Sequence, residues 1–265
     1  MIHATAVIHP QARVDSTVAV GPYAVIDAGV TVGAGCVVGP HVHLTGVTTI
    51  GANNIFHASC VIGDAPQDLK YHGEPTRLRI GDGNVFRECS TVNRSNKLEE
   101  DTVIGSHCYL MATSHVGHNS VVGDHVIIAN GTSLGGHVTV GDRAFISGNC
   151  LIHQFVRVGT LALMQGGAAI SKDLPPFTIA RGDNGICGLN IIGLRRAGFN
   201  PAERLELKQI YHRLFRSGEN FRAALAAAQT EFSSAPAIVM LEFLAASKRG
   251  VCPDPSHNSD AAAED

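Results

Sequence analysis

The stretch SHVGHNSVVGDHVIIANGTSLGGHVTVG, residues 114–141, repeats an aliphatic residue at every sixth position. Neither the 3.6-residue period of an α-helix nor the alternation of a single strand maintains this spacing. A short repeat of this kind is typical of a parallel β-helix, in which the chain winds into stacked coils. The repeated positions are Val116, Val122, Ile128, Leu134 and Val140. They predict a β-helix in this part of the chain.

The six-residue period covers most of the chain. It runs without a break from Ile2 to Ile62 and from Ile104 to Ile170, and apolar residues keep it at Ile80, Phe86 and Val92. The pattern resembles the left-handed hexapeptide-repeat proteins, in which three hexads make one triangular coil of about 18 residues with the aliphatic residues inside. A single coil cannot bury its own apolar row, so stacking must stabilise the fold. The prediction is a mainly β protein built on a left-handed parallel β-helix.

Two polar segments interrupt the period, and a helical pattern follows it. Residues near 64–79 and 93–102 are rich in polar and charged residues and are expected to leave the coil as loops, although Leu98 keeps the register. Rigid scaffolds often carry function on such loops. We assign residues 1–185 to the β-helix and residues 186–250 to a C-terminal α-helical domain.

Three helices are predicted within the C-terminal domain. Asn200 is expected to cap the first, because Asn favours the N-cap and Pro201 favours the first helical position. The predicted helical stretches are 201–217, 221–232 and 236–247. The last residues, 251–265, have little to bury and are predicted to be a disordered tail.

The composition limits the classes of function. A net charge of −3 provides no basic surface for nucleic acid. The absence of a signal-like N-terminus and of an apolar stretch of about 20 residues predicts a cytoplasmic protein without a membrane span. The 7 cysteines are scattered without a C-x-x-C pair, which argues against a disulfide framework or a compact zinc site. The cysteines on the small position of the hexad, interpreted as wall residues, are Cys36, Cys60, Cys108 and Cys150.

Two histidines break the aliphatic pattern and indicate a site. With Val116 inside, His118 lies two positions later and is expected to point outward, and a step of one full coil places Gly136 beside it. An imidazole suits a general base at neutral pH, and a glycine leaves its backbone N–H open to an oxyanion. This combination favours acyl transfer to a hydroxyl. The outward cluster comprises His115, His118, Gly136, His137, His153 and Gln154.

Two other interpretations of the cluster stay open. Surface histidines in a chain that has 14 of them are often simply solvated. Three histidines can also bind zinc with an open coordination position. Zinc-dependent carbonic anhydrases of the hexapeptide-repeat class use a pair of histidines five apart, whereas His115 and His118 are three apart. Zinc is therefore the weaker alternative.

Six motifs carry a more specific resemblance. They are QDLKYHGEPTRL (67–78), HVGHNSVVG (115–123), LGGHVTVG (134–141), HQFVRVG (153–159), KDLPPFTIARG (172–182) and NIIGLRRAGF (190–199). Together they resemble the UDP-N-acetylglucosamine acyltransferase family over nearly the whole chain. The resemblance implies transfer of a 3-hydroxyacyl chain from acyl carrier protein to the 3-hydroxyl of UDP-N-acetylglucosamine, the first step of lipid A biosynthesis. It also implies a homotrimer with active sites between subunits, and no cofactor.

The resemblance assigns roles to individual residues. His118 matches the general base, and Gly136 matches the backbone donor to the oxyanion. Gly166 matches a position that limits acyl chain length, where a glycine leaves room for a longer chain. The positions matched to the sugar nucleotide or its pocket are Asp68, Lys70, His115, His137, His153, Gln154, Asn190 and Arg196.

The chain also departs from the family pattern. The family usually has Asp after the base, where this chain has Asn119, and Ile192 stands where some members have Glu. An amide would stabilise an imidazolium less well than a carboxylate. Asp68 and Lys70 could instead brace or solvate their own loop. A hexapeptide-repeat N-acyltransferase with an amino-sugar nucleotide acceptor and a zinc-dependent carbonic anhydrase remain alternative functions, and the acyl chain length stays open.

Overall fold

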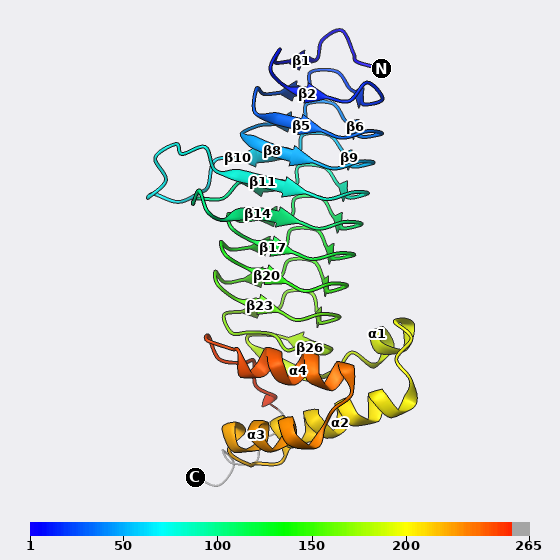
Figure 1. Ribbon diagram of the computed structural model, residues 1–265, viewed down its shortest axis with the longest axis vertical. Coiled ribbons are helices and arrows are strands. Elements are labelled where there is room, and N and C mark those ends of the chain that lie inside the picture. Colours follow the sequence, from blue (N-terminus) through cyan, green and yellow to red (C-terminus); the bar gives the residue numbers. More distant parts are fainter. Residues whose placement is uncertain (256–265) are drawn as a thin grey trace.

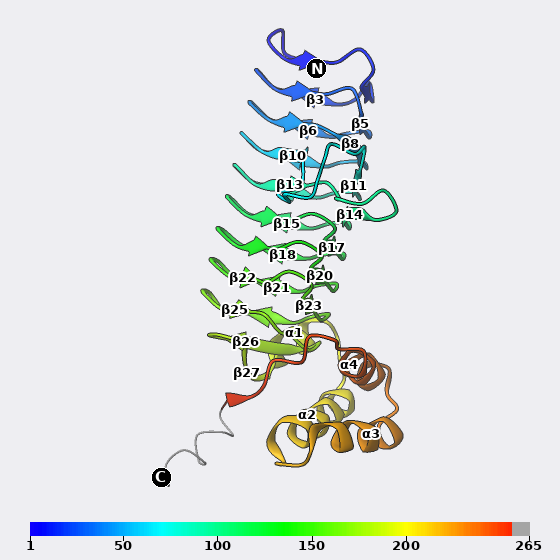
Figure 2. The ribbon, with the colours of Figure 1, turned by 90° about the vertical axis from the view of Figure 1, so that its left-hand side faces the viewer.

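Stacked three-sided coils form the body of the protein, as the computed structural model shows for residues 1–255 (Figure 1). The coils run from the N-terminus, at the top of Figure 1, to a group of helices at the other end, and a second view shows the same prism from the side (Figure 2). The prediction of a left-handed parallel β-helix followed by α-helices is confirmed.

Short strands on the three faces of the prism make three sheets within the described residues. The β1 sheet contains β1 (Val7–Ile8), β4 (Val25–Ile26), β7 (His43–Leu44), β10 (Val61–Asp64), β13 (Thr91–Asn93), β16 (His115–Val116), β19 (Ser133–Leu134), β22 (Leu151–Ile152) and β25 (Ala169–Ile170). The β2 sheet contains β2 (Arg13–Val14), β5 (Val30–Val32), β8 (Val47–Ile50), β11 (Arg77–Ile80), β14 (Asp101–Ile104), β17 (Val121–Val122), β20 (Thr139–Val140) and β23 (Arg157–Val158). The β3 sheet contains β3 (Ala19–Val20), β6 (Val37–Val38), β9 (Ile55–Phe56), β12 (Val85–Phe86), β15 (Tyr109–Leu110), β18 (Ile127–Ile128), β21 (Phe145–Ile146), β24 (Leu163–Met164), β26 (Thr178–Arg181) and β27 (Gly185–Leu189).

The six-residue period determines which side chains enter the core. Val116 pairs with Leu134, its counterpart on the next coil, and both side chains are 0% exposed. The third residue after an inward aliphatic often turns the corner with a left-handed backbone, as Asn119 does with φ 58° and His137 with φ 59°. Asn adopts this conformation more readily than most residues because its short polar side chain tolerates it. The four predicted wall cysteines are all buried.

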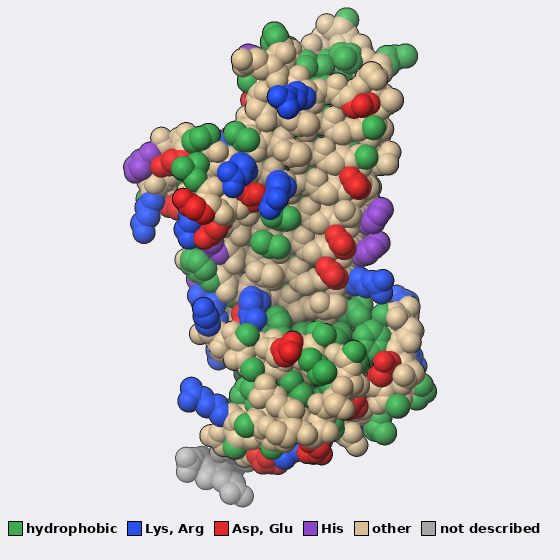
Figure 3. Space-filling model, in the orientation of Figure 1, with side chains coloured by type: hydrophobic (Ala, Val, Ile, Leu, Met, Phe, Trp, Pro, Cys, Tyr) green, Lys and Arg blue, Asp and Glu red, His purple; other side chains and the backbone are tan. Residues whose placement is uncertain are grey.

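The two predicted excursions leave the same side of the prism. The first occupies residues 65–76, between β10 and β11, and the second residues 94–100, between β13 and β14. Charged side chains gather on the projecting excursion (Figure 3). Leu98 is 46% exposed, so the prediction that it keeps the register is wrong, because the chain has left the wall at that point. The Asn96 side chain donates from Nδ2 to Asp68 Oδ2 at 2.7 Å, which joins the excursions.

Four helices follow the β-helix within the described residues: α1 (Ile191–Arg196), α2 (Pro201–Arg216), α3 (Phe221–Glu231) and α4 (Ala235–Ala245). The Asn200 N-cap is present, with Glu203 completing a capping box. Strand β27 continues to Leu189, beyond the predicted boundary at residue 185, because it pairs antiparallel with β26 and closes the stack. None of the described helices has the length and apolarity needed to cross a membrane.

The start of the C-terminal tail is packed against the β-helix. Val251 forms a bridge with Asp173, and Cys252 and Asp254 are buried. The predicted disorder of residues 251–265 is therefore wrong for residues 251–255, because backbone pairing and the Asp254 side chain hold this segment in place. Tyr211 donates to Asp254 Oδ2 at 2.8 Å, and Arg216 Nε at 2.7 Å. The remainder, 256–265, lies outside the described residues.

Asp173 joins the last coil to the helical domain. Its carboxylate is 1% exposed and accepts from Arg157 Nη2 at 2.8 Å and from Ser247 Oγ at 2.8 Å, while Arg157 also donates to the Phe243 carbonyl. Asp173→Ala is expected to lower the free energy of unfolding by about 3 kcal/mol, because it leaves a partly buried guanidinium without its carboxylate. Urea denaturation measures this loss, with Glu99→Ala as an exposed-carboxylate control. An unchanged midpoint would contradict it.

Candidate active site

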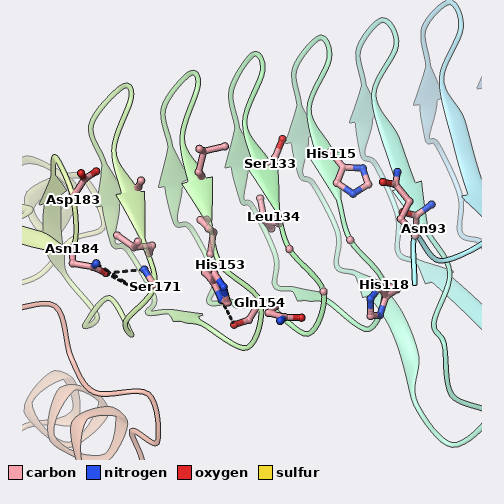
Figure 4. A pocket seen from close by; sticks show the side chains of 18 residues that line it. Asn93, His115, His118, Ser133, Leu134, His153, Gln154, Ser171, Asp183 and Asn184 are labelled. Carbon is pink, nitrogen blue, oxygen red and sulfur yellow. Dashed lines mark hydrogen bonds between the residues drawn. The ribbon is translucent and has the colours of Figure 1, made fainter. Parts of the chain in front are cut away.

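A pocket of about 770 Å³ runs along the β1 sheet across successive coils. His118, His115 and Asn93 lie together at one end, while Asp183 and Asn184 lie at the other (Figure 4). The lining includes five of the six predicted cluster residues, namely His115, His118, Gly136, His153 and Gln154. The period placed these side chains on one face because each full coil returns the chain to the same sheet.

His118 sits at the turn after β16 and faces the next coil. Its Nδ1 lies 2.8 Å from Asn119 Oδ1, and its ring meets the His137 ring edge-on at a centroid distance of 5.2 Å. A Cβ on Gly136 would lie only 2.6 Å from His118 Nε2. The second ring nitrogen of His118 therefore lies directly over Gly136, in space that any other residue would fill.

The backbone of Gly136 has an unused donor. Its carbonyl accepts from Phe155 N at 3.0 Å, but its N–H donates to no residue within 1–255. Gly136 also lines the pocket beside His118. An imidazole nitrogen and a free amide N–H at one place can remove a proton from a hydroxyl and stabilise an oxyanion. This pair meets the requirements of acyl transfer to a hydroxyl.

The neighbouring histidines differ from His118 in their surroundings. Burial lowers the pKa of His115, and the nearby His118 lowers it further. Burial and then His118 likewise lower the pKa of His137. Both rings are therefore neutral at neutral pH. His115 Nδ1 lies 2.8 Å from Thr91 Oγ1, so His115 is held by a neighbour on the coil below.

Comparisons with known proteins show the family to which the chain is similar. The family model for UDP N-acetylglucosamine O-acyltransferase, domain 2, matches residues 173–252, and the bacterial transferase hexapeptide model matches residues 101–136. An acyl-[acyl-carrier-protein]--UDP-N-acetylglucosamine O-acyltransferase of Chlorobaculum parvum is 51% identical over 252 residues, covering 94% of this chain and 96% of the relative. Another of that name from Thermodesulfovibrio yellowstonii is 41% identical, covering 95% and 98%.

The chain belongs to the UDP-N-acetylglucosamine acyltransferase family. A solved structure of a UDP-N-acetylglucosamine acyltransferase from Bacteroides fragilis superposes with a TM-score of 0.91 at 37% identity, covering 95% of this chain and 99% of that one. The similarity therefore includes both the β-helix and the helical end.

Asp68, one of the residues matched to this acyltransferase family, braces both excursions. Its Oδ1 accepts from the backbone N–H of Lys70 at 3.0 Å, which lowers the pKa of Asp68, and Asn96 Nδ2 lowers it further. Asp68 therefore makes a contact that braces its own loop, which was the alternative interpretation of this residue. The Lys70 side chain is exposed and makes no hydrogen bond or ion pair with residues 1–255.

Three predicted residues lie away from His118 within one chain. Asn190 caps α1 by accepting from Gly193 N at 2.9 Å, and its Nδ2 donates to the Leu161 carbonyl at 2.9 Å. Arg196 lies with Asn190 in a separate pocket against the β3 sheet. Gly166 is exposed at the corner after β24. A single chain therefore does not bring Gly166, Asn190 or Arg196 into the His118 pocket.

Some lining residues were not singled out from the sequence. Gln67 begins the loop motif at 67–78 and reaches the pocket from the first excursion. Asn93 also lines the pocket and is 6% exposed, and its buried Oδ1 has no hydrogen-bond partner among residues 1–255. The sequence signal that could have indicated Asn93 is its position at the start of the predicted second excursion. Asp183 and Asn184 directly follow the motif at 172–182.

The cysteine thiols do not enter the pocket lining. Burial raises the pKa of Cys108 to about 11, and burial also raises that of Cys36, Cys60 and Cys150. A buried thiol with a raised pKa is a poor nucleophile at neutral pH. Among residues 1–255, no three His, Cys, Asp or Glu side chains are grouped closely enough to hold a metal ion.

Proposed function

We propose that this protein transfers a 3-hydroxyacyl group from acyl carrier protein to the 3-hydroxyl of UDP-N-acetylglucosamine, the first step of lipid A biosynthesis, with His118 as general base. The observation that carries the proposal is the position of His118 Nε2 directly over Gly136, whose N–H is free within residues 1–255. The names of the relatives supply the two substrates.

The proposed reaction needs no covalent enzyme intermediate. His118 Nε2 takes the proton of the sugar hydroxyl, and the oxygen attacks the thioester carbonyl. The Gly136 N–H donates to the oxyanion of the tetrahedral intermediate. When this intermediate collapses, the carbon–sulfur bond breaks and the thiolate of the carrier protein takes the proton from the imidazolium. None of the seven cysteines, all of which the structure describes, lines the His118 pocket, and this supports direct attack.

The proposal includes a homotrimer with active sites between subunits. Asn190 and Arg196 lie against the β3 sheet, whereas His118 and its pocket lie on the β1 sheet. A single sugar nucleotide that contacts both groups must therefore lie between two copies of the chain. Lys70 and Gly166 are exposed, as contact with a neighbouring copy requires.

Acyl chain length and location complete the proposal. A Cβ at position 166 would meet only the Gly148 carbonyl oxygen, at an ordinary contact distance of 3.6 Å, so glycine leaves space for a longer chain there. All seven cysteines are free thiols, which accords with a cytoplasmic location.

Acyl transfer by the purified protein tests the function. We expect product from UDP-N-acetylglucosamine with a series of 3-hydroxyacyl carrier proteins, and a maximum at the longer chains. The 3-amino analogue of the sugar nucleotide is the second acceptor. Transfer to the amine alone would replace this function with the N-acyltransferase alternative, and no transfer to either acceptor would contradict both.

A further inference from the structure

The base is hydrogen-bonded to a neutral amide. His118 Nδ1 lies 2.8 Å from Asn119 Oδ1, and the Asn119 side chain is buried, with the residue 6% exposed. An amide carries no charge with which to stabilise an imidazolium. The residues around Asn119 therefore determine how well His118 works as a base.

Two contacts orient the Asn119 amide. The backbone N–H of Asn96 can only donate, and it reaches Asn119 Oδ1 at 3.0 Å. The Glu100 carboxylate can only accept when ionised, and its Oε2 lies 2.9 Å from Asn119 Nδ2. Ser95 Oγ lies 2.8 Å from the same nitrogen. The amide oxygen therefore faces His118.

This orientation selects one tautomer of the base. Because Asn119 Oδ1 is an acceptor, His118 Nδ1 must carry the hydrogen between them. The lone pair is then on Nε2, the nitrogen that lies over Gly136 in the pocket. The hydrogen-bonded chain from Glu100 through Asn119 thus leaves the base on the substrate side.

Glu100 also brings a negative charge behind the amide. The hydrogen bond from Lys97 Nζ to Oε1, 2.8 Å long, lowers the pKa of Glu100, so the carboxylate is ionised at neutral pH. Its side chain is 46% exposed, so solvent screens part of this charge. The charge lies one hydrogen bond beyond the amide that contacts the imidazole.

We propose that Glu100 is a positioning residue for catalysis, which fixes the Asn119 amide and supplies the negative charge that stabilises protonated His118 through it. This inference rests on the proposed role of His118 as the base. Glu100 does not touch the reacting atoms and acts through Asn119. Its place in the aperiodic second excursion explains why the hexad pattern does not indicate it.

Other charged and titratable groups face the same ring. His115, His137 and Asp68 each interact electrostatically with His118. Glu100 Oε2 also lies 3.6 Å from His137 Nδ1. Both histidines have lowered pKa values and are neutral at neutral pH, so Asp68 and Glu100 supply the negative charge around His118 and Lys97 opposes it.

Glu100→Gln removes the charge and retains a side chain that can accept from Asn119. We expect kcat/KM for acyl transfer to fall about tenfold, at the low end for loss of a nearby opposite charge because Glu100 is partly exposed. The acidic limb of the pH profile is expected to move to lower pH, since removing a negative charge favours the neutral imidazole. KM for the sugar nucleotide should change little. Glu99→Gln is the matched control, because Glu99 is exposed and has no hydrogen bond or ion pair with residues 1–255.

Moving the charge one residue inward tests the connection to Asn119. In the double variant Glu100→Gln/Asn119→Asp, the new carboxylate at position 119 keeps Asn96 N as a donor, and the net charge equals that of the wild type. The Ser95 hydroxyl, which accepts from Asn119 Nδ2 and donates to the Lys97 carbonyl in the wild type, can rotate to donate to this carboxylate. We expect kcat/KM to recover to within about threefold of wild type, because the carboxylate again stabilises the imidazolium.

Two kinetic results would overturn the inference: activity of Glu100→Gln equal to that of Glu99→Gln, or a double variant no better than Glu100→Gln. The proposed function fails separately, if the wild type transfers no acyl group. Full activity of His118→Ala would remove the base assignment, on which this inference rests, and leave the substrates unchanged. Ring ¹⁵N shifts of His118, assigned by comparison with His118→Ala, report the tautomer without turnover. If the neutral His118 ring carries its hydrogen on Nε2 in the protein without substrates, the inference is also overturned.

Discussion

His118→Ala is expected to lower kcat/KM for acyl transfer by at least about a hundredfold, the usual effect of removing a general base. The Nε2 atom of His118 lies over Gly136 and faces the pocket, where it can take the proton of a bound hydroxyl. Initial rates with saturating 3-hydroxyacyl carrier protein and varied UDP-N-acetylglucosamine measure the loss. We expect the decrease in kcat and little change in KM, because the proton is transferred only in the transition state.

A matched control is available on α2. His212 is exposed and lies outside the His118 pocket, and alanine suits a helix, so His212→Ala should retain wild-type rates. If His118→Ala folds normally and keeps more than about a tenth of the activity, the base assignment is wrong. The substrates would stand in that case, and only the mechanism would change.

Gly136→Ala is expected to lower kcat about a hundredfold, comparable with the loss of an oxyanion donor. The new Cβ would lie 2.6 Å from His118 Nε2 and 2.7 Å from Cε1, which is closer than such atoms approach in proteins. The imidazole must swing away from the reacting hydroxyl, so the same methyl group displaces the base and crowds the backbone N–H. Single-turnover transfer with preloaded carrier protein measures the chemical step.

The fold is expected to survive this change. The contacting atoms belong to the end of a side chain rather than to the backbone, and Gly136 has no left-handed φ to lose. The thermal unfolding midpoint should therefore shift by no more than a few degrees, as for a surface substitution. In the His118→Ala background, Gly136→Ala should cost much less than in the wild type. A full additional hundredfold loss there would mean that the methyl group acts on the oxyanion site alone.

Much of the candidate site followed from the hexad period. The inward aliphatics fix which face each residue occupies, and a step of three hexads puts Gly136 next to His118, as the structure confirms. His115, His153 and Gln154 line the same pocket for the same reason. Their chemical roles stay predictions. Periodic coils permit this inference because every rung repeats the geometry of the rung below.

Residues outside the period escaped this reasoning. Leu98 fits the count but is exposed, because the chain leaves the wall between β13 and β14. Asn93 and Glu100 have no signal in the hexads. Asn93 nevertheless lines the pocket, with a buried Oδ1 that has no partner among residues 1–255, and Glu100 accepts a hydrogen bond from Asn119. The pairing of Val251 with Asp173 joins segments far apart in the sequence, and composition alone favoured disorder for this tail.

The amino-acid sequence was sufficient for the β-helix, the two excursions, the three longer helices and the family, because repeat, caps and motifs are local patterns. The tertiary structure decided which atoms meet. It placed Asn190 and Arg196 on a different face from His118, and it brought Glu100 to the amide behind the base. Loop paths and side-chain hydrogen bonds depend on packing between distant segments, and no period along the chain encodes them.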